Sequence, residues 1–231
     1  MAKGLADARI DAVFSYAGRT AVPVTQPLPQ RIGGFGGVDG LTKWLRDEKI
    51  THVIDATHPF AAQMSRHAFE ACAALHLPLA ALERPPWPVE PGWSEVQDID
   101  HAAQSLPQQP ARVFLAIGRQ HVGVFASAPQ HHYLLRLIDE PAAPLLSCST
   151  TVIARGPFDV AGDLALLRDN GIDIVVTKNS GGIGAEAKLT AARTLDLPVI
   201  MVARPALPPR PSFASVAQIL EWLDHGTVLG V

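Results

Sequence analysis

The chain has 231 residues, with 22 acidic and 19 basic side chains and a formal net charge of −3. Hydrophobic residues make up 48% and charged residues 18%, which excludes a disordered chain. Without an excess of basic residues, nothing in the charge balance indicates nucleic-acid binding. No apolar run reaches the roughly 18–20 residues of a membrane span, and Asp7 and Arg9 interrupt the first apolar stretch, unlike in a signal peptide. We therefore expect a cytoplasmic globular protein.

Strands and helices alternate in the pattern of apolar residues. Runs rich in β-branched residues predict buried strands at 12–16, 52–54, 77–82, 113–117, 133–138, 172–176 and 197–202. Helical periodicity predicts helices at 38–48, 61–75, 160–169, 185–195 and 216–224. Such alternation is typical of an α/β fold, in which a parallel sheet is covered by helices on both faces.

An internal repeat divides the chain into two halves. Residues 71–85 and 191–205 are identical at six of fifteen positions, at an offset of 120 residues. Further matches upstream, such as Ile50 with Ile172, follow at an offset of 122. We expect two domains of one architecture, at 1–95 and 96–231, separated by the proline-rich stretch around 85–93.

The repeat also predicts a difference between the halves. The second half opens with a strand at 112–117 and a Gly-Arg-Gln turn at 118–120. The matching positions of the first half would precede residue 1, and residues 2–9 read as the tail of the helix that follows such a strand. We therefore expect that the first strand of the N-terminal domain is missing.

The segment 11–20, DAVFSYAGRT, is a strand that runs into a polar turn. In a dinucleotide-binding fold the second strand ends at the adenine ribose, where an acidic residue selects NAD. Ser15 and Arg19 instead offer a hydroxyl and a guanidinium, groups that suit a 2′-phosphate. The motif predicts NADP preference, and a solvated surface turn is the alternative. The glycine-rich stretch 31–37 reads as a ligand loop or as a flexible connection.

The segment 51–61, THVIDATHPFA, ends a predicted strand in polar residues at the sheet edge where ligands bind. His58 precedes Pro59, which restricts its backbone to an extended conformation. The other histidines nearby have no carboxylate or cysteine at ligand spacing, so we expect no metal. His58 is either a ligand contact or a structural histidine.

The segment 176–182, VTKNSGG, occupies the matching place in the second half. Lys178, Asn179 and Ser180 are hydrogen-bond donors, and two glycines leave backbone N–H groups accessible at a helix start, an arrangement that favours an anion. A glycine-rich turn with a solvated lysine is the alternative. Neither Cys72 nor Cys148 lies in a motif for nucleophilic catalysis.

Seven motifs come in the order found in one family. They are SYAGRT at 15–20, GGFGGVDGL at 33–41, DATHPFA at 55–61, LERPPW at 82–87, GRQ at 118–120, RGPF at 155–158 and TKNSGG at 177–182. With them the chain resembles the precorrin-6A and cobalt-precorrin-6A reductases of cobalamin biosynthesis, from about residue 11 to residue 205.

The resemblance implies a fold, a reaction and a set of site residues. It implies two Rossmann-like domains with a cleft between them, in which NADPH reduces one double bond of precorrin-6A to give precorrin-6B. The implied cofactor-binding residues are Ser15, Gly18, Arg19, Thr20, Gly34, Gly36, Asp55, Ala56, Thr57, His58, Pro59 and Phe60. The implied substrate-binding residues are Arg119, Lys178, Asn179, Ser180, Gly181, Gly182 and Arg204. His58 is the candidate proton donor, with solvent as the alternative.

Two other functions are compatible with the same motifs. Another NADP-dependent reductase would share the first half and would need no cationic site in the second. A non-catalytic tetrapyrrole- or cofactor-binding protein would bind its ligand without oxidising NADPH. We expect a monomer, because no pattern in the sequence indicates an extended interface.

Overall fold

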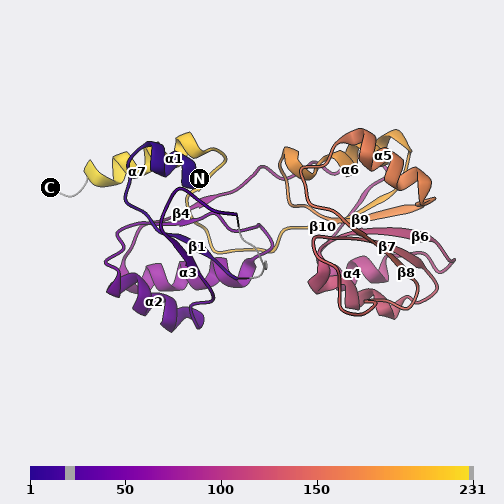
Figure 1. Ribbon diagram of the computed structural model, residues 1–231, viewed down its shortest axis with the longest axis horizontal. Coiled ribbons are helices and arrows are strands. Elements are labelled where there is room, and N and C mark those ends of the chain that lie inside the picture. The colour runs from indigo at the N-terminus through magenta and orange to yellow at the C-terminus, as the bar shows by residue number, and fades with distance from the viewer. Residues whose placement is uncertain (19–23, 229–231) are drawn as a thin grey trace. The chain divides into compact units, whose positions relative to one another are not determined.

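The computed structural model describes residues 1–18 and 24–228, and the chain divides into two compact units (Figure 1). Unit 1 comprises Met1–Arg84 and Ala206–Val231, and unit 2 comprises Pro85–Pro205. The predicted boundary between residues 95 and 96 differs from this division, because the chain leaves unit 1 after Arg84. The C-terminal segment, which we had assigned to the second domain, belongs to unit 1.

Unit 2 is built on a six-stranded parallel sheet with the order β5-β10-β9-β6-β7-β8. Its strands are β5 (Ser94–Val96), β6 (Arg112–Ala116), β7 (His132–Leu137), β8 (Ser149–Ile153), β9 (Ile174–Lys178) and β10 (Val199–Val202). Its helices are α4 (Ile99–Gln104), η1 (Arg119–Ser127), α5 (Val160–Asp169), η2 (Ile183–Ala185) and α6 (Ala187–Thr194). Figure 1 shows α5 and α6 on one face of the strands and α4 on the other. The central strands are buried from both sides, as the apolar runs predict.

Unit 1 contains two smaller parallel sheets. Strands β1 (Phe14–Tyr16) and β2 (Gln30–Ile32) form one, and the other has the order β11-β4-β3. The strands of this second sheet are β3 (Val53–Asp55), β4 (Leu79–Leu82) and β11 (Ser212–Phe213). The helices are α1 (Ala2–Asp7), α2 (Gly37–Asp47), α3 (Ala62–Leu75) and α7 (Val216–Val228). Helices α2 and α3 lie on one face and α1 and α7 on the other (Figure 1).

The structure confirms the internal repeat at the level of strand register. Val53 is paired with Leu79 in unit 1, and Val175 is paired with Val199 in unit 2, which are the positions that the two offsets connect. The backbone repeats as well, because His76 and Asp196, 120 residues apart, both have φ near +55° after their helices. Positive φ is uncommon outside glycine, so its recurrence supports a shared architecture.

Each unit completes its sheet with a strand from the other half of the sequence. After Arg84 the chain enters unit 2, where β5 pairs with β10. After Pro205 it returns to unit 1, where β11 pairs with β4. The Arg-Pro pairs that end the two repeats therefore mark the two crossing points.

The strand orders of the two units correspond except at one place. In unit 2, β6 pairs with both β7 and β9. The counterparts of β7 and β9 in unit 1 are β1 and β3, which belong to separate sheets. Among the described residues of unit 1, no strand pairs with both β1 and β3.

A buried group of charged side chains lies on the α5–α6 side of unit 2. Arg136 and Asp163 form an ion pair whose side chains are 8% and 4% exposed. The Arg136 guanidinium carbon lies 3.8 Å from the ring centroid of Phe158. Lys188 is also buried, and its pKa is lowered to about 7, first by desolvation and then by the charge of Arg136. The charge of Asp163 opposes this lowering, so the same carboxylate acts on both Arg136 and Lys188.

The shared carboxylate makes unit 2 sensitive to a single isosteric change. We expect Asp163→Asn to lower the free energy of unfolding of unit 2 by about 3–5 kcal/mol, because it leaves buried cations without a counter-charge. Urea titration monitored by hydrogen exchange in β6 and β7 measures the change. Adding Arg136→Met to Asp163→Asn should restore part of the loss. A loss below about 1 kcal/mol, similar to that from breaking the exposed Lys43–Asp47 pair, would contradict this account.

Candidate active site

The sequence-predicted residues lie in loops after strands, at the carboxyl edges of the parallel sheets where ligands of α/β proteins bind. In unit 1 these loops follow β1, β2 and β3, and two of the predicted residues, Ser15 and Asp55, lie in the strands themselves. In unit 2 they follow β6, β9 and β10. Each edge is described within its own unit.

The edge at β1 carries a hydroxyl and a guanidinium. Ser15 is exposed, and Nη1 of Arg31 lies 3.4 Å from its Oγ. Arg31 also donates to the carbonyl oxygens of Gly33 and Gly34, at 2.6 and 2.7 Å, and stacks 3.7 Å from the ring centroid of Phe35. The glycine loop is therefore fixed by Arg31, which the sequence prediction missed although it begins the glycine-rich motif.

Two of the predicted glycines have the backbone conformation that their position requires. Gly18, just after β1, has φ of 73°, and Gly36, at the N-terminus of α2, has φ of 82°. Gly34 is exposed beside them. The predicted residues Arg19 and Thr20 lie outside the described residues.

Asp55, at the end of β3, is a buried residue that holds its loop. Its Oδ1 accepts hydrogen bonds from the backbone N–H and the hydroxyl of Thr57, at 3.1 and 2.7 Å. Its Oδ2 lies 3.4 Å from Arg210, a side chain that is 6% exposed and also contacts Glu83 at 2.5 Å. Both carboxylate oxygens of Asp55 thus contact protein groups, and these contacts stabilise the conformation of the DATHPFA loop.

The rest of that loop faces outward. Ala56, Thr57 and His58 are exposed, whereas Pro59 is buried and Phe60 is half-buried. The backbone N–H of Phe60 lies 3.2 Å from Nδ1 of His58. Because Nδ1 accepts this bond, the neutral imidazole carries its proton on Nε2.

In unit 2, the loop after β9 is tied to the segment that enters from unit 1. Asn179 is 4% exposed, its Oδ1 accepts from the backbone N–H of Trp87 at 2.8 Å, and its Nδ2 donates to the Trp87 carbonyl at 2.9 Å. The Trp87 indole N–H donates to the Gly182 carbonyl at 3.1 Å. The side chain that we expected to bind substrate is therefore engaged with the backbone, and it positions the loop.

The turn at Gly181 can be made only by a residue without a side chain. Its φ is +66°, and a Cβ added there would lie 2.2 Å from the carbonyl oxygen of Pro85. The loop is thus packed closely against the 85–87 segment. Gly182 and Ser180, beside it, are half-buried.

Three predicted cations lie at this edge of unit 2. Lys178 ends β9 and is half-buried, and desolvation lowers its pKa to about 8. Arg119 is exposed at the start of η1. Arg204 is partly buried, and its Nε donates to the carbonyl of Asn179 at 2.9 Å, so it also holds the loop.

His121 is a further titratable group beside Lys178. Its pKa is lowered, first by burial and then by the charge of Lys178. The sequence prediction stopped at the Gly-Arg-Gln turn and did not include it. The one feature of the sequence that could have indicated His121 is its position directly after that turn.

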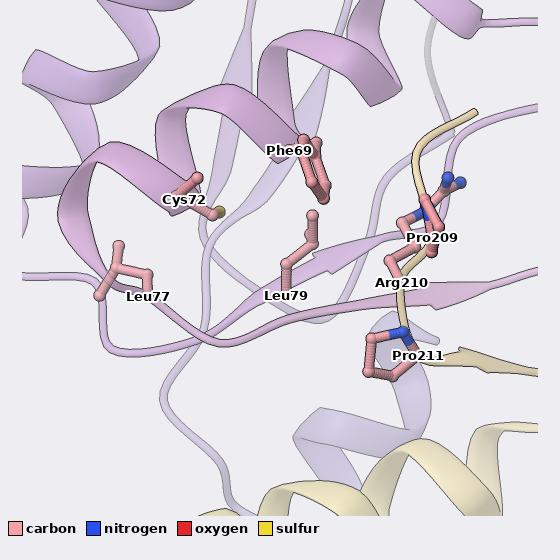
Figure 2. A pocket seen from close by; sticks show the side chains of 8 residues that line it. Phe69, Cys72, Leu77, Leu79, Pro209, Arg210 and Pro211 are labelled. Carbon is pink, nitrogen blue, oxygen red and sulfur yellow. The ribbon is translucent and has the colours of Figure 1, made fainter.

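A small hollow in unit 1 lies between α3 and the segment that precedes β11 (Figure 2). Its lining is largely apolar and includes Phe69, Leu79 and Pro209. Burial raises the pKa of Cys72 in this wall to about 11, so the thiol stays protonated. The hollow therefore offers neither a nucleophile nor a charged recognition group apart from Arg210, which holds Asp55.

Neither a metal centre nor a membrane segment can be assigned within residues 1–18 and 24–228. In these ranges no three histidine, cysteine, aspartate or glutamate side chains are grouped so that they could hold a metal ion. None of the helices described there is long and apolar enough to cross a membrane.

Comparison with known proteins identifies the family. The family model for precorrin-6x reductase CbiJ/CobK matches residues 1–224. The chain is 59% identical to the precorrin-6A reductase of Rhodobacter capsulatus, over 98% of this chain and 92% of that protein. It is 45% identical to the precorrin-6A reductase of Rhodococcus erythropolis, over 96% and 92% of the two chains. A solved structure of CobK precorrin-6A reductase superimposes with a TM-score of 0.93 at 59% identity, covering 97% of this chain and 91% of that one. The chain therefore belongs to the precorrin-6x reductase family, CbiJ/CobK.

Proposed function

We propose that this chain reduces precorrin-6A to precorrin-6B in cobalamin biosynthesis, with NADPH as the reductant. The observation that carries the proposal is the 59% identity over nearly the whole length of a precorrin-6A reductase. The motifs that carry the family resemblance also form the polar loops at the carboxyl edges of the two units. The reaction adds one hydride and one proton across a double bond of the macrocycle.

Unit 1 is the proposed dinucleotide-binding unit. Its β1 edge offers Ser15 and Arg31, and residues 14–18 contain no acidic side chain that would select the 2′-hydroxyl of NAD. The corresponding edge of unit 2, after β7, is filled by the buried Arg136–Asp163 pair and Phe158. At this position unit 2 holds a buried ion pair, whereas Ser15 of unit 1 is exposed.

The residues present suit NADPH. A hydroxyl and a guanidinium fit a 2′-phosphate, and exposed Thr57 and His58 extend the polar surface at the end of β3. When bound, NADPH supplies the hydride from its nicotinamide ring. The task of unit 1 is to orient that ring and exclude water, and Asp55 contributes by holding the loop.

Unit 2 is the proposed site for the carboxylates of the macrocycle. Lys178 is a half-buried cation at the end of β9, where low water access strengthens its attraction to an anion. Exposed Arg119 adds a second cation at the same edge of the sheet. Asn179, Trp87 and Arg204 keep the adjoining loop in place, so these cations sit on a fixed framework.

His58 is the proposed proton donor. Donation requires the imidazolium, so a proton taken up at Nδ1 must replace the Phe60 N–H bond, after which Nε2 of the exposed ring donates. An imidazole can donate a proton near neutral pH, whereas Asp55 is buried and engaged within its loop.

An acidic residue at position 15, in β1, should reverse the choice of cofactor. Ser15→Asp should lower kcat/KM for NADPH at least about a hundredfold relative to NADH, since a carboxylate repels the 2′-phosphate and accepts from a 2′-hydroxyl. Ser15→Ala is the matched control and should shift the ratio less.

Arg19→Ala should weaken NADPH binding about ten- to a hundredfold and leave NADH almost unchanged. Equal losses for both cofactors would contradict the assignment.

The charge of Lys178 should make substrate binding depend on pH. Lys178 is cationic below its pKa of about 8 and neutral above it, so KM for precorrin-6A should rise between pH 7 and pH 9. Lys178→Arg stays charged and should flatten this rise. Lys178→Ala should raise KM about ten- to a hundredfold at pH 7, through the loss of a charged hydrogen bond.

The same variants test which unit binds which ligand. The Kd for NADPH should stay within about twofold in Lys178→Ala, because Lys178 is assigned to the substrate and not to the cofactor. The loss of an anchoring group from the substrate site acts mainly on KM for precorrin-6A. Unchanged tetrapyrrole kinetics with impaired NADPH binding would reverse the assignment of the two units.

A further inference from the structure

Ile183 is the most exposed of the large hydrophobic residues in the described ranges. It is 88% exposed, against 65% for Val24 and 58% for Ile32. It follows Gly182 in the loop after β9 and begins η2. A single exposed apolar residue is ordinary, but this one lies in a loop that we assign to the substrate, where an exposed apolar side chain can contact a ligand.

The loop that carries Ile183 is fixed on both sides. The carbonyl of Gly182 accepts from the Trp87 indole N–H at 3.1 Å, and the carbonyl of Ala185 accepts from Nζ of Lys188. Upstream, the carbonyl of Asn179 accepts from Arg204 at 2.9 Å. Ile183 is therefore exposed on an anchored backbone, and its exposure does not come from a loose tip.

The anchoring also gives the loop a direction. In a trans peptide the carbonyl oxygen and the following N–H point in opposite directions. Because the Gly182 carbonyl points to Trp87, the N–H of Ile183 points away from the packed side. One side of the loop is closed against Pro85 and Trp87, and the other presents a backbone donor and an isoleucine.

A tetrapyrrole is a broad apolar ring with carboxylates at its rim, and it needs both an apolar contact and cations. Ile183 lies five residues after Lys178, on the loop that continues from β9. We propose that Ile183 is the residue of unit 2 that contacts the face of the precorrin ring, and that the Trp87–Gly182 hydrogen bond positions it. The proposal rests on the assignment of the substrate to unit 2.

Ile183→Ser removes the apolar contact with little risk to folding, because the side chain is already exposed. The Kd for precorrin-6A, measured anaerobically by ultrafiltration without reductant, should rise about 5- to 30-fold, the effect of losing much of one buried side chain. The Kd for NADPH should not change. Trp87→Phe keeps the aromatic ring, removes the N–H donor, and should give a smaller rise in the precorrin Kd.

Val13→Ser is the control for losing an exposed apolar side chain, since Val13 is 40% exposed and precedes β1 in unit 1, and it should bind precorrin-6A like the unmodified chain. Lys178→Ala distinguishes failure of the Ile183 contact from failure of the assignment of substrate to unit 2. If Lys178→Ala weakens precorrin binding and Ile183→Ser does not, the contact is refuted and the substrate assignment stands. If neither variant has an effect, the assignment of substrate to unit 2 fails as well.

Discussion

Buried polar side chains at the start of a ligand loop must find hydrogen-bond partners, and in both units the partner comes from the segment that crosses over from the other half of the sequence. Asn179 is satisfied by the backbone of Trp87, just after the first crossing. Asp55 meets Arg210, just after the second. An unpaired buried amide or carboxylate costs several kcal/mol, so the crossing segment stabilises each loop, and Thr57 adds two further hydrogen bonds to Asp55. The segments that exchange strands between the units therefore also stabilise the loops at the carboxyl edges.

The repeat explains why the two halves can differ in role while sharing a fold. The register of β3 with β4 recurs in β9 with β10, so the carboxyl edges present equivalent positions. At the end of β7, unit 2 packs Arg136 with Asp163 and Phe158, whereas Ser15, within β1 of unit 1, is exposed. Loops on a fixed sheet can change their chemistry without disturbing the core, as is general for α/β folds.

Long periodic segments could be predicted from the sequence, and short elements fixed by distant partners could not. The helix Val160–Asp169 and the paired repeats follow from local pattern. Strand β11 has two residues, and its identity as a strand depends on pairing with β4, far away in sequence. Asn179 had the composition of a ligand donor, but its role depends on Trp87, which no local pattern connects to it. Arg210 was missed for the same reason, whereas Arg31 contacts the neighbouring glycine loop and could have been included from local sequence.

The strands of the two units differ in burial, and this difference determines where a bound ligand would add most stability. All four residues of β10 in unit 2 are buried, whereas no residue of β1 or β2 in unit 1 is. Segments with little buried apolar surface open at low free-energy cost, and ligand-binding elements commonly belong to this class. A ligand at one hundred times its Kd stabilises the folded unit by about 2.7 kcal/mol. With NADPH in unit 1, as proposed, cofactor binding would stabilise the weakly buried pair β1–β2, whereas the sheet of unit 2 is stabilised by its own core.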